Sequence, residues 1–349
     1  MKRVLFFICT LDDGGAQRVV SILSSNMAER GFDVEILKYY KSENIYPLSN
    51  KVKVTTVEEN TKTRNIIKNI KWMKHYFKSN ADVIVSFLAK YNMMALLANK
   101  GNNIPIIVAD RNDPRYVPNG KALRLLRNLL YKTADNVIVQ STDNYNYFSN
   151  IINRCEVIMN PFSNKDMVGV ALNANKEKTI VSVGRLEKQK NQELLIRAFK
   201  KINIPDYKLI IYGEGSYRER LERLINELEL EGHVLLPGSR KNILELIKTS
   251  KLFVMSSNYE GMANALAEAM CIGLPVISTK ISAASDLIED DKNGILVCIG
   301  NEEQLVNAML KIINNNDYGK MLAENATKIY EKLSADVITD KWIEIIESI

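Results

Sequence analysis

Three polar side chains recur at every fourth residue in an otherwise apolar stretch of the chain. Glu260 stands in a loop-like segment, and Asn264 and Glu268 follow within a helical pattern. Residues four apart share a helix face, so Asn264 and Glu268 are expected to project the same way as that helix begins. A buried carboxylate is costly unless a partner satisfies it, and a ligand would do so. The alternative is that Glu260 is a solvated loop residue and Glu268 lies on a wet helix edge.

The backbone at the start of this helix offers a second kind of chemistry. Amide N–H groups of Gly261, Met262, Ala263 and Asn264 are expected at the helix N-terminus. An anion gains roughly 0.3 to 1 kcal/mol from the helix dipole there. Carboxylates that bind a diol, next to amides that bind phosphate, describe a site for a nucleotide sugar.

Two cations follow an earlier strand-like run at 179–183. Arg185 and Lys190 come directly after Gly184 and precede a helical pattern. Such a pair can neutralise a diphosphate without a metal ion, although the pair alone is equally compatible with two surface cations. With only two histidines and no clear D-x-D pattern, the sequence predicts no metal site and no Ser-His-Asp triad.

Strand-like and helix-like segments alternate along the whole chain, which predicts α/β domains with doubly wound parallel sheets. We expect a Rossmann-like domain at 1–160 and a second one at 161–330, facing each other across a cleft. Residues 331–349 are expected to form a helix that packs back on the first domain, and the polar stretch up to Lys178 to be a linker. The remaining strand-like runs are at 3–8, 34–38, 52–57, 83–86, 104–108, 137–139, 208–212, 234–236, 252–255 and 294–297, with one more ending at Ser278.

Two polar turns follow strand-like runs in the first half. Gly15 belongs to a glycine pair between the first strand and a helix, where backbone can approach a phosphate or a sugar. Arg111, Asn112 and Asp113 follow the fifth strand, at the edge where open parallel sheets bind ligands, and are candidate acceptor contacts. An ion-paired turn is the alternative.

The charge is unevenly distributed. The first 160 residues hold 23 Lys and Arg against 14 Asp and Glu, whereas the remainder holds 24 against 27. The segment 61–79 has no acid, an apolar stripe at helical spacing and two aromatic residues among its cations. It could lie on an anionic bilayer or steer a lipid-linked phosphate acceptor; an ordinary amphipathic helix with a solvated polar face is the alternative. The cations are Lys62, Arg64, Lys68, Lys71, Lys74 and Lys78.

Composition narrows the class of protein further. No apolar run reaches the roughly 20 residues that span a bilayer, and the apolar start of the chain fits a buried strand better than a signal peptide. Four scattered cysteines suit a reducing compartment. We therefore expect a cytoplasmic protein, with peripheral association at the membrane as a further option. No base-stacking platform is evident, so nucleic acid is not an expected partner.

Five segments resemble, in order, the motifs of glycosyltransferase family 4, retaining enzymes of the GT-B fold. They are GGAQRVVSIL at 14–23, VGRLEKQKNQELLIRAF at 183–199, IYGEG at 211–215, LPGSRKNI at 236–243 and EGMANALAEAMCIGLPVIS at 260–278. The resemblance implies a metal-independent enzyme without a cofactor. It would move a hexose or N-acetylhexosamine from a UDP-sugar to a lipid-linked saccharide in surface polysaccharide biosynthesis. A non-catalytic GT-B subunit, a nucleotide-sugar epimerase and a phosphorylase remain alternatives.

The resemblance also implies roles for individual residues. Arg185 and Lys190 would clamp the donor diphosphate, and Glu260 would lie near the donor sugar. Glu268 would hold the ribose hydroxyls. The other expected donor contacts are Gly15 from the opposite domain, Gly184, Gly238 at the base, the backbone of Gly261, Met262 and Ala263, and Asn264.

Overall fold

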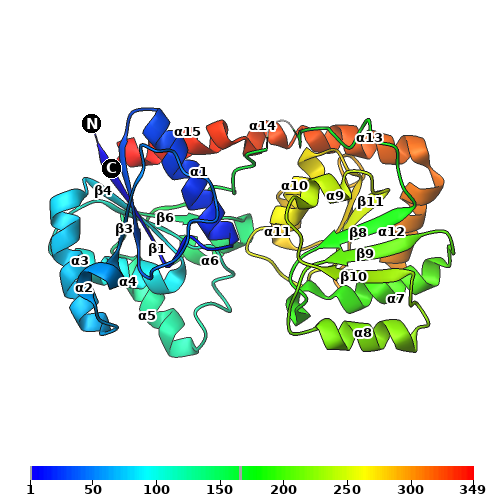
Figure 1. The fold of residues 1–349 in the computed structure, drawn as a ribbon, viewed down its shortest axis with the longest axis horizontal. Helices are drawn as coiled ribbons and strands as arrows, with labels where there is room; N and C mark the ends of the chain where they lie inside the picture. The colour runs from blue at the N-terminus through cyan, green and yellow to red at the C-terminus, as the bar shows by residue number, and fades with distance from the viewer. Residues whose placement is uncertain (1, 165–166) are drawn as a thin grey trace. The chain divides into compact units, whose positions relative to one another are not determined.

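The computed structural model describes residues 2–164 and 167–349 and divides the chain into two compact units. Unit 1 comprises Met1–Ser163 and Leu333–Ile349, and unit 2 comprises Asn164–Lys332. The boundaries expected from the sequence, after residues 160 and 330, lie close to these. Each unit is a parallel sheet covered by helices (Figure 1).

Unit 1 contains a seven-stranded parallel sheet in the order β3-β2-β1-β4-β5-β6-β7. The order reverses beside β1, as in doubly wound folds. The strand-like runs of the sequence predicted the positions of these strands, except for β7. That strand has only three residues and lies at the edge of the sheet. The strands are β1 Arg3–Ile8, β2 Asp33–Lys38, β3 Lys53–Thr56, β4 Val83–Phe87, β5 Ile106–Ala109, β6 Asn136–Val139 and β7 Cys155–Val157.

The helices of unit 1 cover both faces of this sheet. Apolar residues of α1 and α15 share one core with the sheet, and those of α3, α4 and α6, together with Tyr131 of α5, share the other. The helices are α1 Gly15–Glu29, α2 Val57–Thr61, α3 Ile66–Asn80, α4 Ala89–Asn99, α5 Lys121–Tyr131, α6 Thr142–Ser149 and α15 Ala335–Glu347.

The C-terminal helix α15 is an integral part of unit 1. The indole of Trp342 is fully buried and stacks on Phe87 of β4, with ring centroids 5.8 Å apart. The side chain of Asn26 in α1 donates a hydrogen bond to Thr339 (3.2 Å), and Arg30 forms an ion pair with Asp336 (3.0 Å). The last helix therefore completes a core that the first residues of the chain begin.

Unit 2 contains a six-stranded parallel sheet in the order β10-β9-β8-β11-β12-β13. Its strands are β8 Thr179–Val183, β9 Lys208–Tyr212, β10 Val234–Gly238, β11 Leu252–Met255, β12 Val276–Thr279 and β13 Ile295–Val297. Its helices are α7 Gln192–Ile202, α8 Arg218–Glu227, α9 Ile243–Ile247, α10 Asn264–Cys271, α11 Ser282–Ser285, α12 Glu302–Asn314 and α13 Asn316–Thr327, and α14 Tyr330–Leu333 follows them.

The polar stretch that was interpreted as a linker packs onto unit 2. It passes through Lys165 and Asp166, which lie outside the described residues. Beyond them, the backbone N–H groups of Gly169 and Ala171 donate to the carbonyls of Cys271 and Ile272 at the end of α10 (2.9 and 2.8 Å). Ala171 is fully buried, so a small apolar residue anchors a segment whose overall composition is polar.

The basic segment 61–79 is also organised differently from the prediction. Lys62 has a left-handed backbone (φ 50°) that ends α2, and α3 begins only after Asn65, whose side chain caps its first turn. Ile66 and Ile67, which fit the apolar stripe by spacing, are 46% and 63% exposed, and the buried residues of α3 are Asn69, Met73 and Phe77. Of the helices that the structure describes, none is long and apolar enough to cross a membrane.

Replacing Trp342 by alanine tests the place of α15 in unit 1. Removing a large, fully buried aromatic side chain typically costs about 3–5 kcal/mol. We expect Trp342→Ala to lower the free energy of unfolding by about this amount in urea titrations followed by circular dichroism. Tyr145→Ala, which truncates an exposed ring in α6, should change it little. A Trp342 variant as stable as the parent would show that α15 is not part of this core.

Candidate functional site

The carboxyl ends of three neighbouring strands in unit 2 form an edge built of glycines. The amide of Gly184 after β8 donates to the carbonyl of Tyr212 (2.9 Å), and that of Gly213 after β9 donates to Gly238 of β10 (3.1 Å). A Cβ at Gly213 would lie 2.0 Å from the carbonyl oxygen of Gly184, so only glycine permits this approach. Gly184 and Gly238, which the sequence predicts as donor contacts, both lie at this edge, and parallel α/β sheets generally bind ligands there.

An ion pair between Lys190 and Glu260 lies beside this glycine edge. The Nζ atom of Lys190 is 2.6 Å from Oε1 of Glu260, and the two side chains are only 19% and 7% exposed. The same carboxylate accepts hydrogen bonds from the hydroxyl of Ser257 (2.6 Å) and the amide of Gln189 (3.1 Å). Glu260 is therefore held by three groups, and its charge fixes the position of the Lys190 ammonium.

The backbone around this pair is held in place as well. Lys190 ends a short 3-10 turn, Lys188–Lys190, and its carbonyl accepts a hydrogen bond from the hydroxyl of Ser256 (3.0 Å). The amide of Asn258 donates to the carbonyl of Gln189 (2.8 Å). A Cβ at Gly184 would lie 3.2 Å from Cε of Lys190, so the lysine side chain runs closely past this glycine.

Helix α10 begins at Asn264, four residues after Glu260. The methyl side chain of its N-cap residue, Ala263, cannot accept hydrogen bonds from the backbone amides of the first turn. A different acceptor is therefore needed to cap these amides. Met262 and Ala263 are buried, whereas Gly261, Asn264 and Glu268 are half-buried. A helix N-terminus next to a fixed ammonium is suited to bind an anion such as a phosphate.

Arg185 supplies a second cation at the same edge. Its side chain is 68% exposed and forms an ion pair with Glu187 (3.2 Å), while its backbone carbonyl accepts a hydrogen bond from Gln192 (2.9 Å). The structure thus gathers Gly184, Arg185, Lys190 and Glu260 in one region of unit 2. The lysine is held by its ion pair, whereas the long arginine side chain extends into solvent.

The glycine loop of unit 1 is tethered by a residue that the sequence did not single out. Gly15 is exposed and starts α1 directly after the first strand. The hydroxyl of Tyr46 donates to Asp13 (2.8 Å) and accepts from the amide of Gly14 (3.3 Å). Burial raises the pKa of Tyr46, so the phenol stays protonated and can make both hydrogen bonds.

The expectation that Arg111 contacts an acceptor is not supported by its position. Its guanidinium is buried over the rings of Phe87 (4.7 Å) and Trp342 (5.7 Å), and it donates to Asn160 (2.9 Å). Burial lowers its pKa to about 9, in spite of the nearby Asp110. The guanidinium thus lies against a ring of β4 and a ring of α15, and its Nε and Nη2 atoms are buried without a hydrogen-bond partner.

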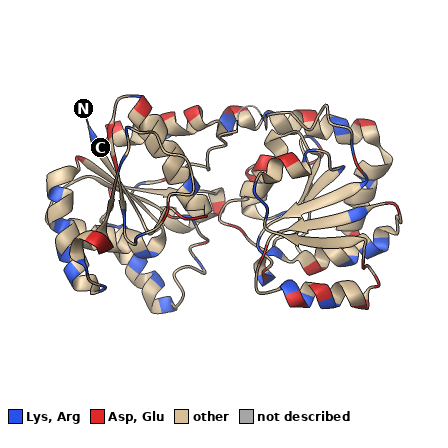
Figure 2. Cartoon of the chain, in the orientation of Figure 1, with Lys and Arg blue, Asp and Glu red and all other residues tan. Residues whose placement is uncertain are grey.

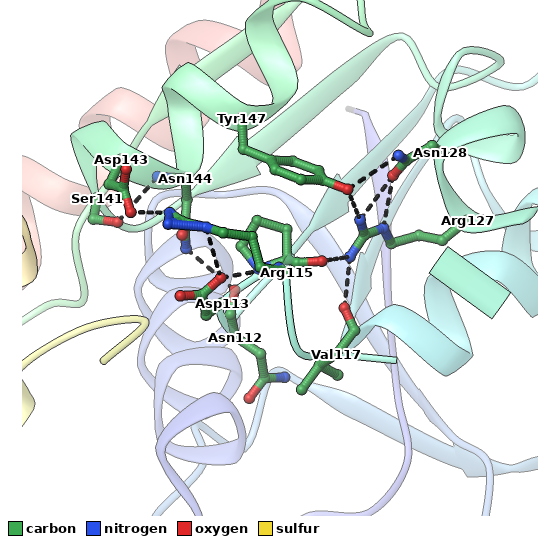
Figure 3. A network of polar contacts seen from close by, with 11 residues as sticks. Asn112, Asp113, Arg115, Val117, Arg127, Asn128, Ser141, Asp143, Asn144 and Tyr147 are labelled. Atoms are coloured by element: carbon green, nitrogen blue, oxygen red, sulfur yellow. Dashed lines mark hydrogen bonds and ion pairs between the residues drawn. The ribbon is translucent and has the colours of Figure 1, made fainter. Parts of the chain in front are cut away.

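The two neighbouring candidates differ from each other. Asp113 is buried, accepts a hydrogen bond from the amide of Arg115 (2.9 Å) and pairs with the guanidinium of the same residue (3.4 Å). It therefore stabilises its own turn, which is the ion-paired alternative. Asn112 is half-buried, and its side chain points away from that network (Figure 3), so it remains a candidate acceptor contact.

Sequence reasoning missed the residues that hold the site together. Gln189 and Ser257 bind Glu260, and Tyr46 binds the glycine loop. The only signal for the first two was their closeness in sequence to Lys190 and Glu260; Tyr46 gave none. Within the described residues, no three His, Cys, Asp or Glu side chains are grouped as metal ligands.

Comparison with known proteins adds a family match. Residues 163–329, almost all of unit 2, match the sequence model of the family described as glycosyl transferases group 1. An uncharacterized glycosyltransferase of Methanocaldococcus jannaschii is 30% identical over 72% of this chain and 75% of its own length.

Two further similarities extend over the whole chain. The Campylobacter jejuni enzyme named GalNAc-alpha-(1->4)-GalNAc-alpha-(1->3)-diNAcBac-PP-undecaprenol alpha-1,4-N-acetyl-D-galactosaminyltransferase is 27% identical over 100% of this chain and 99% of its own. The crystal structure of Anabaena HepE in complex with UDP and glucose has the same fold, with a TM-score of 0.86, 19% identity and full coverage of both chains.

A double-mutant cycle tests whether Lys190 and Glu260 depend on each other. We expect Lys190→Ala to lower the free energy of unfolding by roughly 1–3 kcal/mol, because it leaves a buried carboxylate without its cation. Lys190→Ala combined with Glu260→Ala should cost less than the sum of the single changes. The matched control is Lys188→Ala, an exposed lysine of the same turn, which should be near neutral. Additive effects in urea titrations would mean that the pair is not coupled.

Proposed function

The chain belongs to the group 1 glycosyl transferases, and we propose that it transfers a hexose or an N-acetylhexosamine from a UDP-sugar to a lipid-linked saccharide. The observation that carries this proposal is the buried pair of Lys190 and Glu260 beside the glycine edge of unit 2. It supplies a cation that is in place before a ligand arrives, at the edge where α/β sheets bind nucleotides.

The donor diphosphate is assigned to three groups of unit 2. Lys190 and the first-turn amides of α10 bind it from a fixed position, and the exposed Arg185 reaches over it. Together they can offset the charge of a diphosphate, so the proposed enzyme works without a metal ion. Glu260 acts through Lys190 as a positioning residue, because its carboxylate is already occupied by protein groups.

The nucleoside and the sugar are assigned to neighbouring residues. Glu268, one helical turn after Asn264 in α10, binds the ribose hydroxyls, and Asn264 faces the same way. Gly238, at the carboxyl end of β10, is assigned to the base; a Cβ there would lie 2.6 Å from Oε1 of Glu214, so only glycine leaves room for this carboxylate. Gly15 and Asn112 of unit 1 remain the proposed contacts outside unit 2.

The proposed reaction retains the anomeric configuration. The bond between the anomeric carbon and the diphosphate oxygen breaks, which leaves positive charge on the sugar and negative charge on the diphosphate. Lys190, Arg185 and the α10 amides stabilise the negative charge. The acceptor oxygen bonds to the anomeric carbon from the face that the diphosphate leaves, and the proton of its hydroxyl passes to a departing phosphate oxygen.

The lipid-linked acceptor is supported by two observations. The Campylobacter jejuni relative, similar over the full chain, is named for an undecaprenyl-diphosphate saccharide acceptor. The cations of unit 1 along α3 and α5 would favour a diphosphate on a lipid (Figure 2). We propose a role in the assembly of a surface polysaccharide at the cytoplasmic face of the membrane.

A donor screen tests the function directly. The purified full chain is incubated with UDP-GalNAc, UDP-GlcNAc, UDP-galactose or UDP-glucose and a polyprenyl-diphosphate saccharide, with and without EDTA. We expect mass spectrometry to find one added sugar with at least one donor, NMR to show an α linkage, and EDTA to leave the rate unchanged. Lys190→Ala should lose roughly a hundredfold in turnover, whereas Lys188→Ala should not.

Three results would contradict parts of this proposal. No transfer and no release of UDP with any donor would favour a non-catalytic subunit. A β-linked product from these α-linked donors would exclude retention. Loss of turnover in EDTA, restored by a divalent cation, would exclude the metal-independent site.

A further inference from the structure

Helix α5 of unit 1 is oriented with its apolar face outward. Its leucines at positions 123, 125, 126 and 129 are 47%, 69%, 47% and 65% exposed. At 100° per residue they form one continuous arc of the helix surface. A helix that covers a sheet ordinarily buries this arc and exposes its charges, so α5 reverses the usual pattern.

The charged face of α5 is held inside the unit by specific contacts. Arg127 is fully buried, and its guanidinium donates to the carbonyls of Pro114 (2.9 Å) and Val117 (2.5 Å) and to the hydroxyl of Tyr147 (3.0 Å) (Figure 3). One turn later, the buried hydroxyl of Tyr131 donates to Asp110 (3.1 Å). Rotating the helix to bury its leucines would break these hydrogen bonds. The outward leucine face is therefore fixed by the fold.

The apolar surface continues from α5 onto α4. Leu97 of α4 is 43% exposed and, together with Leu96, Ile104, Pro105 and Leu130, lines part of a groove of about 530 Å³, which Asn99, Asn103 and Thr133 also line. Two charged residues also line it: Lys100, and Asp135, whose carboxylate accepts a hydrogen bond from the amide of Ile106 (2.8 Å). The exposed leucines and this groove are referred to below as the leucine surface.

Cations surround the leucine surface. Helix α5 contains no acid, and Lys121 and Lys132 at its two ends are exposed, as is Lys100 at the groove. Helix α3 packs beside α4 on the same face of the sheet and carries the exposed Lys68, Lys71, Lys74 and Lys78 (Figure 2). Exposed apolar side chains bordered by lysines match the chemistry of an anionic bilayer, with acyl chains below a layer of phosphate groups.

The aromatic residues of α3 do not take part in this surface. Trp72 and Tyr76 are half-buried and stack on each other (4.6 Å), and the hydroxyl of Tyr76 donates to Glu35 of β2 (2.5 Å). The sequence had suggested them as interfacial anchors. In the structure α3 exposes its lysines together with Ile66 and Ile67 of its first turn, and α5 exposes four leucines.

We propose that the leucine surface of α5 and α4 inserts into the interface of an anionic membrane, with the lysines of α3 and α5 on its phosphate groups. This deepens the proposed function, because a lipid-linked acceptor lies in such a membrane. A second copy of the chain fits less well, since a symmetric contact through this surface would bring the same lysines against each other.

Vesicle binding by a leucine variant tests this inference without any substrate. Leu125→Gln combined with Leu129→Gln changes the two most exposed leucines of α5, and glutamine keeps the helix propensity. The matched control combines Leu246→Gln and Ile299→Gln, which are 45% and 49% exposed in unit 2. We expect the parent and the control to float with vesicles that contain phosphatidylglycerol and not with pure phosphatidylcholine. The α5 variant should partition at least about tenfold more weakly.

The outcomes separate this inference from the proposed function. Unchanged vesicle binding by a folded α5 variant would overturn the inference. The inference would also be overturned if the parent protein did not bind vesicles and instead formed a dimer that the α5 variant cannot form. That result would assign the leucine surface to a second copy of the chain. Normal transfer by the variant to a water-soluble short-chain acceptor, with vesicle binding lost, would support it. Vesicle binding by a parent that transfers no sugar would contradict the proposed function and leave this inference standing.

Discussion

An ion pair between two loops organises the glycine edge of unit 2. Glu260 is almost fully buried, and a buried carboxylate is stable only with a cation and hydrogen-bond donors around it. Lys190, Gln189 and Ser257 meet this need, which ties the turn after β8 to the loop after β11. A Cβ at Gly184 would crowd Cε of Lys190 at 3.2 Å, whereas Gly213 is required for a separate reason, because a Cβ there would lie 2.0 Å from the carbonyl oxygen of Gly184.

Much of the fold could be predicted because most strands are uninterrupted apolar runs. The bounds of β1, β8 and β9 coincide with those expected from the sequence. The β7 strand was missed because it is a three-residue edge strand, and edge strands bury few side chains. The segment 61–79 fits one helical stripe by spacing, yet Asn65 caps α3, which begins only at Ile66, and Ile66 and Ile67 are exposed.

The sequence predicted those site residues that belong to recognisable motifs, but not the contacts between them. Arg185, Lys190 and Glu260 do gather in unit 2, but the sequence gave no sign that the lysine and the glutamate neutralise each other, since that depends on loop closure. Arg111 was misjudged for a related reason: Trp342 from the far end of the chain covers it. In α5, the cation Arg127 lies in the core and four leucines lie at the surface. Charge composition alone does not say which face is buried.

The most direct test of the whole account is a crystal structure of the full chain with UDP bound. It should place a β-phosphate oxygen within hydrogen-bond distance of Nζ of Lys190 and of the first-turn amides of α10, with the ribose hydroxyls on Glu268. UDP bound elsewhere, or bound with its diphosphate away from Lys190, would contradict the central claim that this preformed ion pair builds the donor site.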